Sequence, residues 1–323
     1  MGVRQLGGEL VLEYIEKYNG KITKTAIARQ LCHDYPNLFT SEDAARALIR
    51  YYTKSLGSKN RAKKSDFVSF NLPTPDTTNT LPFKLPKSVT DLAVIGDIHI
   101  PYHDIPAVEV AIKYIKDNKI PYVLLNGDIL DMYNGSSFQK DRKKRDLAQE
   151  LRDCKEFYQW IRQELPDQVI YYKEGNHEAR WERFLSQVNP AMLDVEDFKL
   201  SQIMRFGELK IIEVDTKGPV MAGRLPIFHG HETGMKSGGV NPARSLALRT
   251  KQHGMTSHFH RSSVHRTPHY LEGSKVTYSI GCLCNLSPEY MPINEWSHGF
   301  GRVKVNGKDF HVELINIEDG KIY

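Results

Sequence analysis

The feature that most constrains the fold of this chain is a short apolar run that ends in two polar side chains. Leu92 to Ile95 are apolar, Gly96 follows, and Asp97 and His99 come directly after it. Such a run, closed by a glycine, is typical of a buried strand in a parallel sheet. Ligands of open α/β sheets bind beyond the carboxyl ends of such strands. Alternation along the strand would point Asp97 and His99 the same way, and this pair suits a divalent metal ion.

Four later segments repeat this arrangement. Apolar strand-like runs near residues 120–125, 168–172 and 225–228, and the turn after Gly254, also lead into polar side chains. Helical patterns at about 105–116, 140–165 and 241–251 alternate with them, which predicts an α/β fold. The metal-type residues at the five ends are Asp97 and His99, Asp128, Asn176 and His177, His229, and His258 and His260.

The order of these motifs resembles the calcineurin-like metallophosphoesterase family over about residues 91–323. The family signature is Asp-x-His, Gly-Asp, Gly-Asn-His-Asp/Glu, a lone His often in His-Gly-His, and Gly-His-x-His. All five blocks occur here, and the one departure within them is Ser257 in place of Gly. The resemblance implies an α+β sandwich of two mixed β-sheets flanked by helices.

The resemblance also implies a site for two divalent metal ions. Carried over by position, the first ion would be held by Asp97, His99, Asp128 and His260, and the second by Asp128, Asn176, His229 and His258. Asp128 would bridge the two ions, and a bridging hydroxide would attack phosphorus. A mixed His/Asp/Asn set favours manganese, with iron or zinc as alternatives.

Three further residues match positions near the reacting phosphate. His177 corresponds to the family's histidine over the scissile phosphate, which would stabilise charge or protonate the leaving oxygen. Asp131 matches the carboxylate that orients this histidine in the protein-phosphatase branch, and the alternative is a helix N-terminal acid. Arg180 is a candidate phosphate contact, as is Arg261.

Two positions argue against a Ser/Thr protein phosphatase. That branch has arginines where this chain has Met132 and Glu174. The DNA-clamping insertions of the nuclease branch are not recognisable either. The four cysteines are scattered, with only Cys282 and Cys284 close together, so we expect reduced cysteines in a cytoplasmic protein.

Residues 1–64 predict a separate, small all-α domain. Three amphipathic helical patterns, at about 7–18, 25–35 and 41–52, precede a basic run and resemble a helix-turn-helix DNA-binding module. Residues 1–66 have 12 Lys/Arg and 7 Asp/Glu, whereas the rest of the chain has 32 of each. The candidate nucleic-acid contacts are Arg46, Arg50, Lys54, Lys59, Arg61, Lys63 and Lys64. The alternative is a helical protein-interaction domain with a solvated basic face.

The predicted organisation is therefore a helical domain (1–64), a Pro-rich linker (65–90) and a phosphoesterase domain (91–323). No apolar run is long enough for a transmembrane helix, so we expect no membrane partner. The combination of domains resembles phage or mobile-element proteins. No sequence feature indicates an oligomeric state.

The predicted function is hydrolysis of a phosphoester substrate, DNA or a nucleotide, by a phosphodiesterase or nuclease. A phosphomonoesterase or protein phosphatase with an N-terminal protein-interaction domain is one alternative. A DNA-binding or structural protein with a vestigial site is another.

Overall fold

The computed structural model describes residues 3–53, 80–135, 146–235, 238–268, 270–271, 273–289 and 291–323. The chain divides into two compact units, Met1–Asp76 and Thr77–Tyr323. The domain limits predicted from the sequence remain predictions, because residues 54–79 lie outside the described part.

Within residues 3–53 the first unit contains three helices, as the sequence predicted. They are α1 (Val3–Tyr18), α2 (Lys24–Asp34) and α3 (Glu42–Tyr52). Thr23 and Ser41 cap α2 and α3, because each side chain accepts a hydrogen bond from a backbone N–H three residues later, at 3.2 Å. The apolar faces meet in a small core that includes Val11, Leu31 and Ile49.

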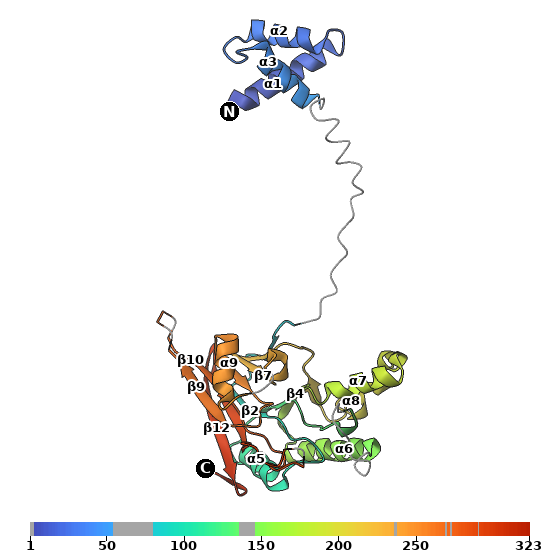
Figure 1. The fold of residues 1–323 in the computed structure, drawn as a ribbon, viewed down its shortest axis with the longest axis vertical. Coiled ribbons are helices and arrows are strands. Elements are labelled where there is room, and N and C mark those ends of the chain that lie inside the picture. The colour runs from blue at the N-terminus through green and yellow to red at the C-terminus, as the bar shows by residue number, and fades with distance from the viewer. Residues whose placement is uncertain are drawn as a thin grey trace. The chain divides into compact units, whose positions relative to one another are not determined.

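The second unit contains two mixed sheets (Figure 1). The strands of one are β2 (Asp91–Ile95), β3 (Tyr122–Asn126), β4 (Val169–Lys173), β5 (Ile211–Glu213), β11 (His298–Asn306), β12 (Asp309–Glu318) and β13 (Lys321–Ile322). Those of the other are β1 (Phe83–Lys84), β6 (Val220–Ala222), β7 (Leu225–Phe228), β8 (Gly254–Thr256), β9 (Ser263–Thr267) and β10 (Lys275–Ser279). Within the described residues their orders are β13-β12-β11-β2-β3-β4-β5 and β1-β6-β7-β8-β10-β9.

Helices cover both outer faces of this sandwich. They are α5 (Ile105–Asp117), α6 (Leu147–Glu164), α7 (Ala179–Val188), α8 (Leu200–Ile203) and α9 (Pro242–Thr250). Figure 1 shows α5 and α6 on one side and α9 on the other. Alternation along β2 explains the layers, because Ala93 and Ile95 pack in the core beneath α5 and α6, whereas Leu92 and Val94 pack between the sheets. The predicted fold of two mixed sheets flanked by helices is confirmed.

Several element boundaries differ from the sequence predictions. The predicted helix at about 241–251 begins at Pro242 and ends at Thr250. Helix α7, which lies outside the three helical patterns of the sequence analysis, ends at Val188, and Pro190 then opens a 3-10 turn (Pro190–Asp194). The two-residue strand β1, in the segment predicted as a linker, pairs in parallel with β6. Strands β1, β6 and β9 are too short or too polar to show a clear periodic pattern. None of the described helices combines the length and apolar character needed to cross a membrane.

Candidate metal centre

The predicted metal ligands lie in loops that follow β2, β3, β4, β7 and β8. Five of them have left-handed backbone conformations with φ between 53° and 69°: Asp97, His99, Asp128, His258 and His260. Such conformations cost of order 1–3 kcal/mol each in residues other than glycine and cluster at functional sites. Strand alternation was therefore the wrong reason for the common direction of Asp97 and His99, because β2 ends at Ile95.

Asp128 lies at the middle of the assembled side chains. Its side chain is 1 % exposed. Its Oδ2 lies 3.2 Å from His229 Nε2 and 3.9 Å from His99 Nε2. The Nε2 atom of His229 also lies 3.2 Å from Asn176 Oδ1. The residue predicted to bridge two metal ions is thus placed between members of both predicted ligand sets.

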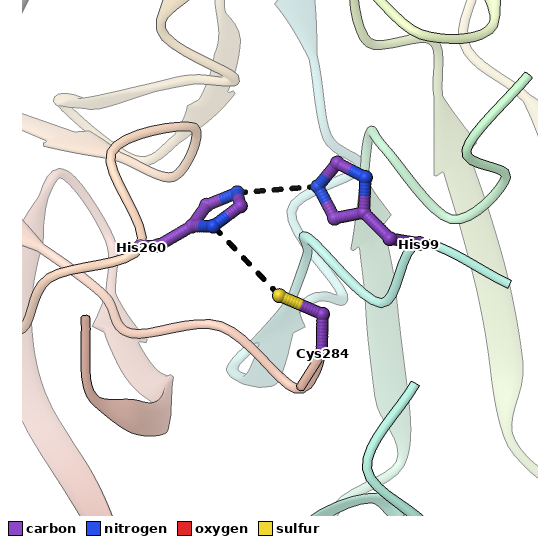
Figure 2. Close-up of side chains that lie close together, drawn as sticks. All are labelled: His99, His260 and Cys284. Atoms are coloured by element: carbon purple, nitrogen blue, oxygen red, sulfur yellow. Dashed lines mark hydrogen bonds between the residues drawn. The ribbon is translucent and has the colours of Figure 1, made fainter. Parts of the chain in front are cut away.

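His99, His260 and Asp97 form one side of the centre. The Nε2 atoms of His99 and His260 face each other at 3.1 Å (Figure 2). Asp97 Oδ1 lies 3.4 Å from His260 Nε2, and Asp97 Oδ2 accepts a hydrogen bond from the backbone N–H of His258 at 2.8 Å. Two imidazole nitrogens that each bind one ion at about 2.0–2.1 Å lie about 3 Å apart, so the observed separation fits a shared ion.

The opposite ring nitrogens of these histidines have different partners. His229 Nδ1 lies 2.7 Å from the carbonyl oxygen of Asn126, and His99 Nδ1 lies 3.1 Å from Asp131 Oδ1. His260 Nδ1 instead lies 3.7 Å from the sulfur of Cys284, as Figure 2 shows. Partners at Nδ1 hold Nε2 toward a metal ion. The sequence offered no signal for Cys284 beyond its nearness to Cys282.

The electrostatics of the site favour a bound cation. Burial raises the pKa of Asp128, but the imidazoles of His177 and His229 outweigh burial and hold this pKa well below its usual range. Burial lowers the pKa of His229, yet the Asp128 carboxylate outweighs it and raises the pKa to about 10. Burial lowers the pKa of His258 to about 4, which leaves its imidazole neutral and able to donate a lone pair.

The donor set fits divalent metal ions. Within the described residues, the buried atoms Asp97 Oδ1 and His258 Nδ1 have no hydrogen-bond partner. Potential ligand atoms gather within 4.8 Å of one another in three groups: His99, Asp128 and His177; Asp128, His229 and His258; and His99, His260 and Cys284. Two of these groups share Asp128, as expected for a bridging ligand.

Two glycines allow the loops to approach Asp128 and His229 closely. A Cβ atom on Gly127, which has a φ of +84°, would lie 2.5 Å from His229 Nδ1. A Cβ atom on Gly175 would overlap the Asp128 carboxylate. The Gly-Asp and Gly-Asn-His motifs therefore need glycine for close packing, independently of any role in chemistry.

The structure brings His177, Asp131 and Arg180 together. His177 Nδ1 donates to the backbone oxygen of Asp131 at 2.7 Å, whereas the Asp131 carboxylate is 3.3 Å away and contacts His99 more closely. Arg180 donates to His177 Nε2 at 2.8 Å and to the backbone oxygen of Asp131 at 3.0 Å. Asp131 thus touches both His177 and His99.

Two buried glutamates that the sequence did not single out organise the loops. The Glu178 carboxylate accepts from the backbone N–H groups of Asp128, Ile129, Leu130 and Gly175, at 2.7–3.1 Å. Glu232 accepts from the N–H groups of His229 and Gly230 and from the ammonium of Lys173. Each glutamate closely follows a metal-type motif, in Asn-His-Glu and His-Gly-His-Glu, which is the signal that could have identified it.

Of the candidate nucleic-acid contacts, Arg46 and Arg50 lie on α3. The guanidinium of Arg46 is 3.5 Å from carboxylate oxygens of both Glu42 and Asp43. The other candidates, Lys54, Lys59, Arg61, Lys63 and Lys64, lie outside the described residues. Residues 3–53 have seven Lys/Arg and six Asp/Glu, so the basic excess of the N-terminal segment belongs to the residues after α3.

Comparisons with known proteins found a matching family and several relatives. A family model described as calcineurin-like phosphoesterase matches residues 90–278. The gene 54 protein of Mycobacterium phage L5 is 26% identical over 245 residues, and that of phage D29 is 26% identical over 248 residues. Each match covers 71% of this chain and 94% of the phage protein.

Similar solved structures include Vps29 from Entamoeba histolytica in complex with zinc, which is 14% identical with a TM-score of 0.38. The phosphoesterase Yfce from E. coli is 16% identical with a TM-score of 0.34. Each match covers 72% of this chain and 96% of the other.

Proposed function

The chain belongs to the calcineurin-like phosphoesterase family, and we propose that it is a binuclear-metal-dependent phosphoesterase that acts on DNA or nucleotides. The observation that carries this proposal is the convergence of seven His, Asp and Asn side chains from five loops, with the buried Asp128 at their middle. Strained backbone at five of these positions supports a functional rather than a purely structural role.

The proposed ligands of one ion are Asp97, His99, Asp128 and His260, and those of the other are Asp128, Asn176, His229 and His258. Manganese is the proposed metal, with iron or zinc as alternatives. When bound, such a pair of ions polarises the phosphoryl group and activates water as the nucleophile near neutral pH. The protein's contribution is to hold these side chains in place through the backbone and Nδ1 contacts described above.

His177 is proposed to hold the proton for the leaving oxygen. Burial lowers its pKa, but Asp128 and Asp131 outweigh burial and raise it. While Arg180 donates to Nε2 the imidazole is neutral, so Nε2 takes up its proton once Arg180 turns to the phosphate. A protonated imidazole can donate to the oxygen that departs from phosphorus. Arg180, which lies 2.8 Å from His177 Nε2, is proposed to contact the phosphate when substrate displaces this hydrogen bond. Asp131 orients His177 through its backbone oxygen.

DNA is the proposed substrate class, cleaved by phosphodiesterase or nuclease chemistry. The three capped helices of the first unit and the basic run after them support DNA binding by Arg46, Arg50, Lys54, Lys59, Arg61, Lys63 and Lys64. Related proteins in two mycobacteriophages support an origin in a phage genome and activity in the host cytoplasm.

One observation favours a second candidate, a phosphomonoesterase whose N-terminal helices bind a protein. The three helices are nearly neutral in charge, and Arg46 is occupied by Glu42 and Asp43. Hydrolysis of p-nitrophenyl phosphate without cleavage of diesters would select this candidate.

The test compares the wild-type chain with Asp128→Asn and His177→Asn, with metal content measured for each. We expect the wild-type chain with manganese to hydrolyse bis-p-nitrophenyl phosphate and DNA. Asp128→Asn should lose both metal and activity, whereas His177→Asn should keep its metal and lose about 10²–10⁴ in turnover. Near-normal turnover in His177→Asn would remove the proposed acid, and inactivity of the wild-type chain on every phosphoester would overturn the function.

A further inference from the structure

One segment of the second unit carries a net positive charge because it contains almost no acidic residues. Between Glu232 and Glu289 the sequence has seven Lys/Arg and a single acid, Glu272. Residues 91–323 as a whole have 30 Lys/Arg and 31 Asp/Glu, so the rest of this unit is acidic. A one-sided distribution of this kind gives a local positive potential that attracts polyanions.

This segment forms the margin of the six-stranded sheet. Strand β9 is the last strand of the order, and within the described residues no strand pairs with its outer edge. Helix α9 is fixed beside it, because the backbone N–H of Ala243 donates to Ser263 Oγ at 3.1 Å. The carbonyl oxygen of Ala243 also accepts from Thr277 Oγ1 of β10 at 2.7 Å. The basic side chains of α9 and β9 therefore share one margin of the domain.

Two arginines on this margin are available to a ligand. Arg261 is occupied, because it donates to the carbonyl oxygen of Gly239 at 2.6 Å and pairs with Glu295 at 2.7 Å. Arg244 on α9 and Arg266 on β9 are exposed, and neither has an ion-pair partner in the described part of the chain. Arg244 lies near the start of α9 and directly follows Ala243, which contacts Ser263. Arg266 lies three residues after Ser263 on β9.

The margin leads away from the metal centre toward exposed apolar side chains. Strand β9 begins three residues after His260, a proposed metal ligand, and spans about 13 Å at about 3.3 Å per residue. Val264 on this strand is 54% exposed, and beyond it Tyr270 and Leu271 are 99% and 84% exposed. Cations combined with an exposed aromatic ring match the phosphates and bases of a single-stranded nucleic acid.

We propose that the margin formed by α9 and β9 binds single-stranded DNA and directs it to the metal centre. Arg244 and Arg266 contact phosphates on either side of the edge strand, and Tyr270 stacks on a base. This inference rests on the proposed function for the cleavage step, but binding along the margin can be measured without catalysis.

The experiment measures fluorescence anisotropy of a labelled oligothymidylate with the full chain in EDTA. The double variant Arg244→Glu/Arg266→Glu is expected to bind about tenfold or more weakly near physiological salt. Its slope of log affinity against log salt should be shallower by about 1.4, because each single-strand phosphate that an arginine neutralises adds about 0.7 to that slope. Tyr270→Ala should weaken binding of the single strand severalfold and leave duplex binding unchanged.

The matched control is Lys87→Glu/Lys119→Glu, a double charge reversal at exposed loop positions before β2 and β3. It should bind the oligonucleotide like the wild-type chain. Wild-type affinity in the arginine variant, or an equal loss in the control, would overturn the proposed margin. If Tyr270→Ala weakened binding of duplex and single-stranded DNA equally, the proposed preference of the margin for single strands would be overturned.

Hydrolysis of bis-p-nitrophenyl phosphate by the wild-type chain is measured in parallel. If the wild-type chain hydrolyses neither this diester nor any other phosphoester, the proposed function fails. The anisotropy measurement still shows whether the margin binds single-stranded DNA. Thermal midpoints of all variants, compared with that of the wild-type chain, identify any variant whose loss of binding comes from misfolding.

Discussion

Individual residues in the metal centre are held in conformations that their own chemistry disfavours. Asp97, His99, Asp128, His258 and His260 all have positive φ. The surroundings stabilise these conformations, for example through the hydrogen bond from the N–H of His258 to Asp97. Precise placement of these residues therefore depends on side chains that never reach a substrate.

Glu178 is the clearest such side chain. The two carboxylate oxygens of Glu178 accept hydrogen bonds from four backbone N–H groups. A glutamine at this position keeps one oxygen acceptor, and its NH₂ group faces the other two N–H groups, which then have no acceptor. We expect Glu178→Gln to lose about 2–4 kcal/mol of unfolding free energy, measured by chemical denaturation, and to bind metal more weakly. Glu182→Gln, at an exposed position of α7, which begins directly after Glu178, is the control and should change neither property. Wild-type stability in Glu178→Gln would show that these hydrogen bonds contribute little.

Cys284 is predicted to orient His260. Cys284 is 3% exposed, and its thiol is the contact at His260 Nδ1, where His99 and His229 have oxygen partners. Cys284→Ala should weaken metal binding about 10–100-fold, measured by competition with a chelator, and Cys284→Ser should restore part of the affinity. Cys154→Ala removes another buried thiol, on the core-facing side of α6, and should leave metal affinity unchanged. Equal affinities for Cys284→Ala and the wild-type chain would exclude an orienting role.

At the scale of elements, the parallel strands converge on the site, and the helices secure the loops that leave them. Helix α6 does this through Glu150, whose carboxylate accepts from the N–H of Tyr133 at 3.2 Å. Tyr133 opens the 3-10 turn (Tyr133–Gly135) just after Asp131. Helix α6, whose apolar face packs against the core, thus also anchors the loop that carries Asp131.

Glu150 should make stability depend on pH. Burial and the nearby Asp131 raise its pKa from 4.5 to about 7. Because the folded state then binds the proton more tightly, Glu150 favours folding below pH 4.5, and this contribution is lost as pH rises to about 7. The loss is of order 2–3 kcal/mol. Glu150→Gln should reduce the difference in unfolding free energy between pH 5 and pH 7.5, with exposed Glu156→Gln as the control. If the unfolding free energy of Glu150→Gln changed between these two pH values as much as that of the wild-type chain, this assignment would be contradicted.

At the scale of the whole molecule, two units with separate cores should respond separately to metal. The proposed ligands all belong to the unit Thr77–Tyr323, and the three N-terminal helices bury their own apolar residues. Calorimetry of the full chain should show two thermal transitions. Manganese at 100 times its dissociation constant should raise only one of them, by about 2.7 kcal/mol of unfolding free energy. EDTA should reverse the shift. A single thermal transition that shifts with manganese would mean that the two units unfold together.

Much of this protein was predictable from residues close together in sequence. Apolar runs that end in polar residues placed most strands of the parallel core and located Asp97, Asp128, Asn176 and His229 in the loops beyond them. Capping residues and apolar faces marked the three N-terminal helices. These signals are local, because burial of an apolar run and satisfaction of a helix end depend on neighbouring residues.

The sequence by itself therefore determined the fold class and the residue types that gather at one edge of the sandwich. Only the tertiary structure decided how they are held: the left-handed backbone at Asp97 and His99, the Glu178 carboxylate beneath Asp128, and the sulfur of Cys284 behind His260. The partners in these contacts are up to 161 residues apart, as in the hydrogen bond from His258 to Asp97. No periodicity or local propensity encodes such pairs, because they form only after the two sheets have packed.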